Sequence, residues 1–231
     1  MKPLIETDQE FICDIHAPCF QQLTEEEAAL IRDSKTQVMF RKGENLTKQG
    51  TFASYVLFII NGLVKQYVEG DVNHNFNLQI IQPNEFLGLS AVFGESIYPY
   101  SATALTETQV YLIEKEALKT VVQQNGAFAY TIIQRYCEQN TRFFGLVRNL
   151  IYKQMNGHMA DALLYLSSIN TDGQDVTSLL TRKEIADFAG ISTESAVKIL
   201  KTLAKDGVVM LTDKTVTILD RTRLEEISKR G

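Results

Sequence analysis

The stretch from Thr181 to Gly207 constrains the fold of this 231-residue chain most, because local signals define two short helices and the turn between them. Thr181 and Glu184 have the spacing of a capping box, which starts the first helix. Gly190 ends that helix, since glycine adopts the left-handed C-cap conformation at little cost. Ser192 is a preferred N-cap residue and starts the second helix. The stretch therefore predicts a helix, a tight turn and a second helix.

The second helix is amphipathic, and a hairpin follows it. Its apolar face holds Ala196, Ile199, Leu200 and Leu203, and its polar face holds Thr193, Glu194, Val197, Lys198 and Lys201. Gly207 stops the helix, and two short apolar runs, 208–211 and 215–219, flank the turn Thr212-Asp213-Lys214. The whole arrangement is typical of a winged helix-turn-helix, whose second helix enters the major groove of DNA.

The polar face of the second helix has side chains suited to base edges. Glu194 can accept a hydrogen bond from cytosine N4, and Lys198 can donate to guanine O6 or N7. They are four residues apart and share one face of the helix. The predicted DNA-binding residues are Thr181, Arg182, Ser192, Thr193, Glu194, Ser195, Val197, Lys198, Lys201 and Lys214. The alternative is a protein-interaction module, in which Glu194 and Lys198 form a solvated pair worth only ~0.2–0.5 kcal/mol.

The N-terminal half has a different pattern. Thr24 and Glu27 form another capping box, which opens a short helix. From Val38 to Ile113, short β-rich runs alternate with turn signals, and Asn61-Gly62 between two apolar runs is a strong hairpin signal. Strands at such regular spacing predict an all-β sandwich or barrel.

A long helix is predicted from Gly126 to Ile151. Its apolar positions follow alternating steps of four and three, which is a heptad seam: Ala129, Ile133, Tyr136, Asn140, Phe143, Val147 and Leu150. A single Asn in such a seam favours a dimer, and the alternative is that the stripe packs on its own domain. Gly157 is expected to interrupt the helical pattern before a second helix. The predicted domains are 1–125, 126–151 and 152–231.

Charge and composition exclude several classes. The net charge is -5, with 12 Lys and Arg against 17 Asp and Glu in residues 1–150 and 11 of each in 151–231. A DNA-binding face is therefore expected to be local. Acidic residues follow Met1 closely, and no apolar run approaches the ~18 residues of a membrane helix. The sparse cysteines Cys13, Cys19 and Cys137 favour a reducing compartment, so we expect a cytoplasmic protein without a membrane partner.

Enzymatic sites are not apparent. The three histidines lie in separate segments, so no metal site is predicted: His16, His74 and His158. No nucleophile with an adjacent base stands out, and no glycine-rich phosphate loop follows a strand. We therefore expect no catalytic residues and no enzyme activity.

The stretch from Thr181 to Gly207 resembles the CRP/FNR family of transcription regulators, because it matches the pattern T-R-x-E-I-A-x-x-x-G-x-S-x-E-x-x-x-K/R-x-L-x-x-L-x-x-x-G. Four N-terminal segments resemble the family's cyclic-nucleotide-binding β-roll: Lys42-Gly43-Glu44, Gln49-Gly50, Asn61-Gly62-Leu63-Val64 and Pro83-Asn84-Glu85-Phe86-Leu87-Gly88. The resemblance implies an α+β protein with a jelly-roll-like antiparallel β-roll sensor domain, a long dimerisation helix and a C-terminal winged helix-turn-helix. It further implies a homodimer on a pseudo-palindromic DNA site, controlled by an effector, with RNA polymerase as a candidate partner.

The sequence departs from the family where cyclic AMP would bind. Members that bind cyclic AMP have a Glu at the position of Leu89 and an Arg at that of Tyr100. The adenine-reading polar pair falls near Phe143 and Phe144. Because an uncompensated phosphate charge would cost several kcal/mol in such a pocket, we do not expect cyclic AMP. The candidate effector pocket is Phe86, Gly88, Leu89, Ser90, Tyr100, Ser101, Ala102, Phe143 and Phe144, and its small-molecule effector is unidentified.

Two further departures concern a cofactor and the DNA contact. An iron–sulfur cluster needs four cysteines, but Cys13 and Cys19 are only part of that set, Tyr111 stands at the central position, and Cys137 falls on the long helix. Val197 and Lys198 replace the more usual small polar residue and Arg, and Lys is a point donor rather than a fork. A sensor that has lost specific DNA binding is therefore the alternative function.

Overall fold

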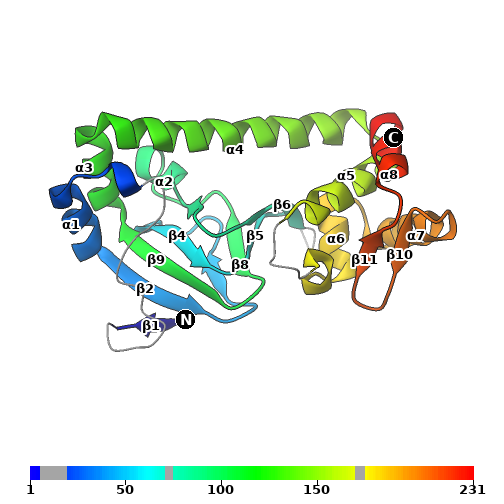
Figure 1. Ribbon diagram of the computed structural model, residues 1–231, viewed down its shortest axis with the longest axis horizontal. Coiled ribbons are helices and arrows are strands. Elements are labelled where there is room, and N and C mark those ends of the chain that lie inside the picture. The colour runs from blue at the N-terminus through cyan, green and yellow to red at the C-terminus, as the bar shows by residue number, and fades with distance from the viewer. Residues whose placement is uncertain (6–19, 71–74, 170–174) are drawn as a thin grey trace. The chain divides into compact units, whose positions relative to one another are not determined.

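The computed structural model describes residues 1–5, 20–70, 75–169 and 175–231. The chain forms two compact units. The first unit comprises residues 1–66 and 80–142, and the second comprises 67–79 and 143–231. Figure 1 shows strands in the first unit and mostly helices in the second. The units divide the chain differently from the predicted domains, because residues 67–79 and the second half of the long helix cluster with the C-terminal helices. Cys13, Cys19, His16 and His74 lie outside the described residues.

Two antiparallel sheets form the β-roll, as expected from the turn spacing. The five-stranded sheet has the order β1 (Lys2–Leu4), β2 (Lys35–Phe40), β9 (Thr108–Glu114), β4 (Tyr55–Asn61) and β7 (Phe86–Leu87). The four-stranded sheet has the order β3 (Asn45–Thr47), β8 (Ser101–Ala104), β5 (Val64–Glu69) and β6 (Asn75–Ile81). β9 pairs with β2 on one side and with β4 on the other, and its residues are mostly buried.

Aromatic side chains fill the core of the first unit. The ring of Phe58 on β4 lies 4.9 Å from that of Phe86 on β7 and 5.2 Å from that of Phe20. Phe128 and Ile132 extend this core from the long helix. Helices α1 (Glu25–Asp33), α2 (Ser90–Phe93) and α3 (Lys115–Gln124) complete the unit, and a short 3-10 turn covers Phe20–Gln22.

The hairpin predicted at Asn61-Gly62 is wrong. β4 and β5 flank this turn but belong to different sheets, so the chain crosses between sheets there. The turn hydrogen-bonds to the β8–β9 connection instead, since the Leu63 N–H donates to Thr106 Oγ1 at 2.9 Å and the Leu105 N–H donates to the Leu63 carbonyl at 2.8 Å. Gly62 has a φ of 92°, and a Cβ there would lie 2.5 Å from the Glu107 carbonyl oxygen. Glycine is therefore needed for close approach of the two connections.

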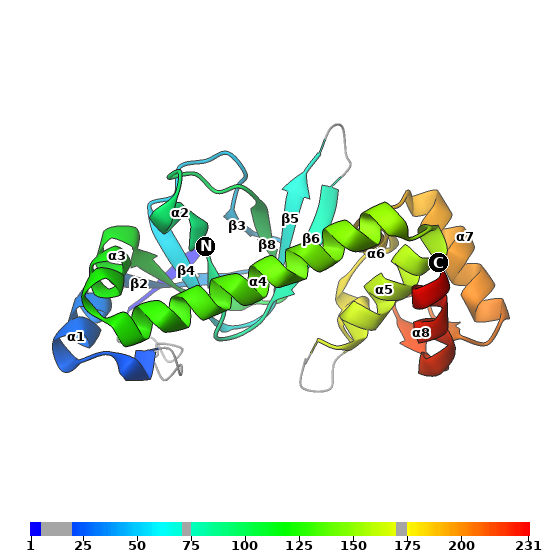
Figure 2. The ribbon, with the colours of Figure 1, turned by 90° about the horizontal axis from the view of Figure 1, so that it is seen from above.

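The long helix α4 spans Gly126–Tyr152, close to the expected range, and Figure 2 shows it unbroken. Asn125 precedes it and accepts a hydrogen bond from the Phe128 N–H at 2.9 Å, while its Nδ2 donates to Glu27 at 2.7 Å. The helical pattern breaks at Lys153 and Gln154, and not at Gly157, which lies in the first turn of the next helix. Gly157 instead permits contact with Gly231, whose carbonyl carbon would lie 2.9 Å from an added Cβ.

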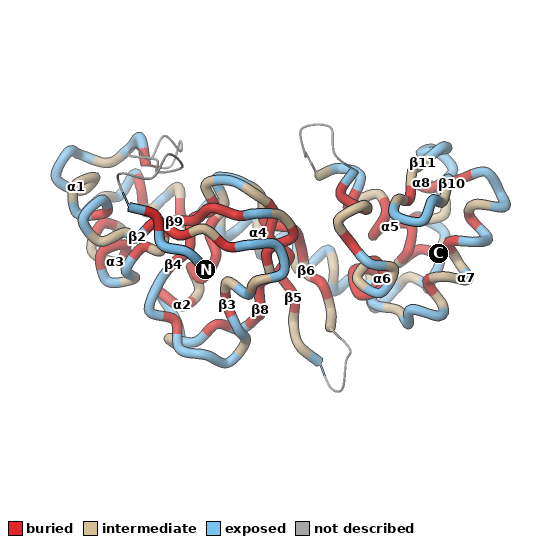
Figure 3. The backbone as a smooth tube through the Cα atoms, turned by 90° about the horizontal axis from the view of Figure 1, so that it is seen from below, coloured by how far each residue is buried: buried red, intermediate tan, exposed pale blue. Residues whose placement is uncertain are grey.

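The second unit is helical apart from one two-stranded hairpin and residues 67–79. Its elements are α5 (Met155–Ser167), a 3-10 turn (Val176–Leu179), α6 (Arg182–Ala189), α7 (Thr193–Lys205), β10 (Val209–Leu211), β11 (Val216–Ile218) and α8 (Arg221–Arg230). α5 packs against α6 and α8. Figure 3 shows buried residues along α5 and α6, and Met159, Leu163 and Ile185 are among them. The structure confirms the predicted α+β fold class. No helix among the described residues combines the length and the apolar character needed to cross a bilayer.

Candidate nucleic-acid interface

The two helices of the motif are capped as the sequence predicts. The Glu184 N–H donates to Thr181 Oγ1 at 3.1 Å, and the Thr181 N–H donates back to the Glu184 carboxylate at 2.7 Å. Gly190 has a φ of 64° and ends α6 in the left-handed conformation. The Ser195 N–H donates to Ser192 Oγ at 3.1 Å and so fixes the start of α7. These local hydrogen bonds orient α7 relative to α6.

The polar face of α7 is open to solvent. Glu194 and Lys198 form an ion pair at 2.8 Å between Oε1 and Nζ, and their side chains are 80% and 74% exposed. Exposed i,i+4 pairs contribute only about 0.3–0.5 kcal/mol. Both side chains can therefore leave the pair for a DNA base at little cost. Thr193 and Lys201 are exposed beside them, whereas Ser195 and Val197 are half-buried.

The wing forms a rigid turn that presents Lys214. The Thr215 N–H donates to Thr212 Oγ1 at 2.9 Å, and the Thr212 N–H donates to the Thr215 carbonyl at 3.1 Å. Lys214 is exposed between them, with its N–H directed to Thr212 Oγ1 at 3.3 Å. The charged end of Lys214 is thus available at the tip of the hairpin, where a phosphate contact would need it.

Arg182 contacts the wing. Its Nη2 donates to the Thr212 carbonyl at 2.6 Å and to the Thr215 carbonyl at 3.2 Å. The residue is half-buried. The sequence places Arg182 among residues facing DNA, but its guanidinium joins the start of α6 to the wing turn. No sequence signal indicates this contact, since the partners are 30 and 33 residues away.

Sequence reasoning also missed Thr177, which supports the second wing strand. Its hydroxyl accepts a hydrogen bond from the Val216 N–H at 2.9 Å and donates to Asp175 Oδ1 at 2.7 Å. Asp175 in turn caps the 3-10 turn by accepting from the Thr177 N–H at 2.8 Å. An Asp two residues before a Thr is a turn signal, but nothing local links it to the wing.

The predicted effector residues of the first unit are buried except for Ser90, which is half-buried, and two of the buried ones bond to each other. The Gly88 N–H donates to the Tyr100 hydroxyl oxygen at 2.8 Å. Tyr100, at the sequence position where the resemblance implies a phosphate-binding Arg in members that bind cyclic AMP, is thus engaged by the backbone of this same chain. Ser101 Oγ accepts from the Gln49 N–H at 2.9 Å. Phe86 and Leu89 belong to the apolar core, and Ala102 is fully buried.

Burial also raises the pKa of both tyrosines in this region. The pKa of Tyr98 rises to about 12 because burial disfavours the phenolate, although its hydroxyl donates to the Tyr55 carbonyl at 2.7 Å. Burial raises the pKa of Tyr100 further. Both phenols are therefore neutral at physiological pH and supply no charge for an anionic ligand.

The predicted dimer seam is largely exposed in the single chain. Ile133 is 59% exposed and Val147 52%. Tyr136, Asn140 and Leu150 are also exposed, whereas Ala129 and Phe143 are half-buried. Phe144, of the predicted effector set, is exposed as well. Phe128 and Ile132, on a neighbouring face, pack into the core. The stripe therefore does not pack on its own domain over most of its length.

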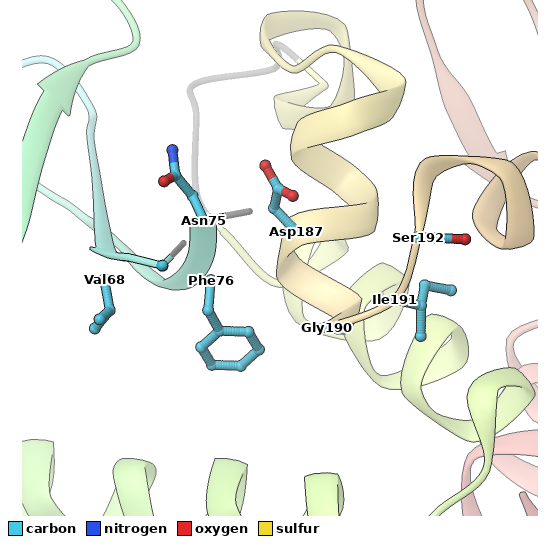
Figure 4. A pocket seen from close by; sticks show the side chains of 8 residues that line it. Val68, Asn75, Phe76, Asp187, Gly190, Ile191 and Ser192 are labelled. Atoms are coloured by element: carbon cyan, nitrogen blue, oxygen red, sulfur yellow. The ribbon is translucent and has the colours of Figure 1, made fainter. Parts of the chain in front are cut away.

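A hollow of about 300 Å³ lies within the second unit, beside the turn of the motif. Figure 4 shows Asn75 and Phe76 of β6 opposite Asp187 of α6 and Gly190, which follows that helix. The neighbouring Asn77 donates its Nδ2 to the Glu184 carbonyl at 2.9 Å. This hydrogen bond ties the β6 segment to the first turn of α6. Among the described residues, no group of three or more His, Cys, Asp or Glu side chains could hold a metal ion.

Comparison with known proteins identifies the family. Residues 37–125 match the profile of the cyclic nucleotide-binding domain, and residues 157–227 match that of the Crp-like helix-turn-helix domain. The chain belongs to the CRP/FNR family of transcription regulators. Members of the CRP/FNR family bind DNA and are not enzymes, which confirms two expectations from the sequence.

Relatives span nearly the whole CRP/FNR chain. The CRP-like cAMP-activated global transcriptional regulator of Mycobacterium tuberculosis is 26% identical over 212 residues, which cover 90% of this chain and 95% of the relative. The anaerobic regulatory protein of Bacillus subtilis is 24% identical over 197 residues, which cover 83% of each. A crystal structure of a CRP/FNR regulator from Eubacterium rectale superposes with a TM-score of 0.76 at 20% identity, covering 92% of this chain and 98% of that one. The first two are named for different signals, so the effector of this chain does not follow from them.

Proposed function

We propose that this CRP/FNR protein is a homodimer that binds a pseudo-palindromic DNA site and inserts α7 of each copy into the major groove. The observation that supports this most is the polar face of α7. Glu194 and Lys198 are exposed, lie near the N-terminal end of the helix and can each reach a base edge. The capped turn before α7 and the wing at Lys214 supply neighbouring phosphate contacts.

The exposed seam on α4 supports the dimer. Ile133, Tyr136 and Val147 would be poorly placed in a monomer because large apolar patches at a protein surface usually mark an interface. A two-fold symmetric protein reads a two-fold symmetric site, with half-sites about one helical turn apart. A dimer therefore explains both the seam and the expected form of the operator.

The regulator is proposed to respond to an effector other than cyclic AMP. The Gly88 N–H, which lies in a segment that resembles the cyclic-nucleotide-binding β-roll, already donates to the hydroxyl of Tyr100. A cyclic phosphate would need to displace a buried phenol and would find no guanidinium there. RNA polymerase stays a candidate partner, and no described residue identifies its contact.

The experiment that tests this function is enrichment of sequences from a pool of random duplex DNA near physiological salt. The wild type is compared with Glu194→Ala/Lys198→Ala and with Glu116→Ala/Lys119→Ala. The control removes an exposed ion pair of α3, so both double variants have the same net charge. We expect the wild type and the control to enrich an inverted repeat and the α7 variant to enrich none. Equal enrichment by all three proteins would contradict the assignment of α7.

A further inference from the structure

The first unit has a cavity of its own, beside helix α4. It has a volume of about 410 Å³ and is formed by α2, α3 and α4. Its floor is buried, since Leu89 is 7% exposed and Ile132 2%. Its rim is open, with Phe93, Ile133 and Tyr136 about half exposed. A deep floor with an open rim and this volume is typical of a small-molecule site.

The lining of this cavity selects for uncharged ligands. Val122, Ala129 and Gly94 complete the wall, and no lining residue is charged. An ion placed there would lose water without gaining a counter-charge, which is costly. An apolar ligand, by contrast, would gain from burial against the aliphatic and aromatic side chains.

One polar atom in the wall has no partner. Ser90 Oγ, at the start of α2, is buried and makes no hydrogen bond to any described residue. A buried hydroxyl without a partner costs free energy until a ligand or water satisfies it. Ser90 therefore gives this largely apolar cavity an unpartnered hydroxyl for polar recognition.

We propose that this cavity binds a small, uncharged, largely apolar molecule with one hydrogen-bonding group, such as an aromatic alcohol, which bonds to Ser90 Oγ. Ala129, Ile133 and Tyr136 line the cavity and also belong to the predicted dimer seam. We therefore describe this ligand as the effector, and that description rests on the proposed function. The ligand would thereby lie beneath the helix face that a second copy covers. Binding itself requires neither DNA nor a known operator.

The test is calorimetric titration of the full chain with 2-naphthol, an uncharged aromatic alcohol, in the absence of DNA. Ala129→Phe fills the cavity, and the matched control Ala127→Phe adds the same ring to an exposed position of the same helix. We expect about one 2-naphthol per chain for the wild type and the control, and at least about tenfold weaker binding for Ala129→Phe. No saturable binding by the wild type, or equal binding by the two variants, would overturn the proposal.

A smaller change keeps the proposal testable if Ala129→Phe does not fold. Ser90→Ala removes only the hydroxyl and is expected to weaken 2-naphthol binding by about 2- to 10-fold; unchanged affinity would overturn the assignment of Ser90.

Sedimentation with and without 2-naphthol tests whether a side chain of the second copy occupies the cavity instead of a small molecule. If 2-naphthol dissociates the dimer in proportion to its binding, a side chain of the second copy fills the cavity and the small-molecule site is wrong. If DNA enrichment fails while 2-naphthol binds as expected, the proposed function is wrong and the small-molecule site stands.

Discussion

Arg182 Nη2 donates to the Thr212 carbonyl oxygen at 2.6 Å, and this contact joins the first helix of the motif to the tip of the wing. The same nitrogen reaches the Thr215 carbonyl at 3.2 Å. The two carbonyls flank Lys214, so the guanidinium determines where that lysine is presented. The sequence assigns Arg182 to DNA binding, whereas the structure places it where it positions Lys214, another predicted DNA-binding residue.

Arg182→Ala is expected to loosen the wing and to weaken DNA binding by about 1.5–3 kcal/mol, the range for hydrogen bonds to a charged group. Hydrogen exchange at the Leu211 and Val216 amides should become faster at the same time. Lys183→Ala, which removes the exposed neighbouring cation, is the control and should leave the exchange unchanged. If Arg182→Ala instead lowers the salt dependence of binding by about one phosphate and leaves the wing amides protected, Arg182 contacts DNA directly.

The seam on α4 yields a prediction about assembly. Ile133→Asp would bury a carboxylate in the proposed interface and should raise the dimer dissociation constant by on the order of 100-fold or more. Gln134→Asp introduces the same side chain at the next, exposed position and should have little effect. Analytical ultracentrifugation at micromolar concentration measures both. A wild type that sediments as a monomer, or variants that behave alike, would contradict the dimer seam.

Gly190 and Gly145 make a matched pair for stability. Gly190→Ala places a Cβ on a residue with a φ of 64°, which costs roughly 1–2 kcal/mol for a non-glycine residue in the left-handed region. The added Cβ also lies 2.9 Å from Leu150 Cδ2. Gly145→Ala, in the middle of α4 with nothing within 4 Å of the added Cβ, should stabilise by about 0.5–1 kcal/mol. Denaturant unfolding that shows the same sign for both would be incompatible with the turn geometry.

The buried tyrosines predict a loss of stability in alkali. An unfolded chain loses the Tyr98 proton near pH 10.0, whereas the folded chain retains it up to about pH 12. The stability that arises from this difference in the pKa of Tyr98 is fully present below pH 10 and is lost as the pH rises to 12. Tyr98→Phe should therefore reduce the fall in stability across that window and remove one late step from the phenolate absorbance titration. A phenolate titration in which all nine tyrosines ionise together near pH 10 would show that Tyr98 is solvated.

Local chemistry made the helix-turn-helix predictable. The capping box at Thr181, the left-handed Gly190 and the N-cap at Ser192 are all confirmed. In each of them the bonded partner lies only three or four positions away along the chain. The long helix was likewise predicted nearly to its ends, because its apolar period persists for many turns. Such features depend little on the rest of the fold.

Features that depend on distant partners could not be predicted. The Asn61-Gly62 turn has hairpin chemistry, but its partners lie in the β8–β9 connection more than 40 residues away. Strand β1 (Lys2–Leu4) exists through its pairing with β2, and α8 through packing on α5. The same limit applies to the site, where Tyr100 bonds to Gly88 and Arg182 to the wing. The sequence identifies the residue types, and only the fold determines which atoms meet.

The most direct test of the central claim is the ratio of affinities for the enriched site and for a scrambled duplex, measured at one salt concentration for the wild type, Lys198→Ala and Lys119→Ala. If α7 reads bases, Lys198→Ala should lose about 1–3 kcal/mol on the enriched site and relax specificity at one base pair, while Lys119→Ala, which removes an exposed lysine of α3, keeps the wild-type ratio. An unchanged ratio for Lys198→Ala would contradict the placement of this helix in the major groove.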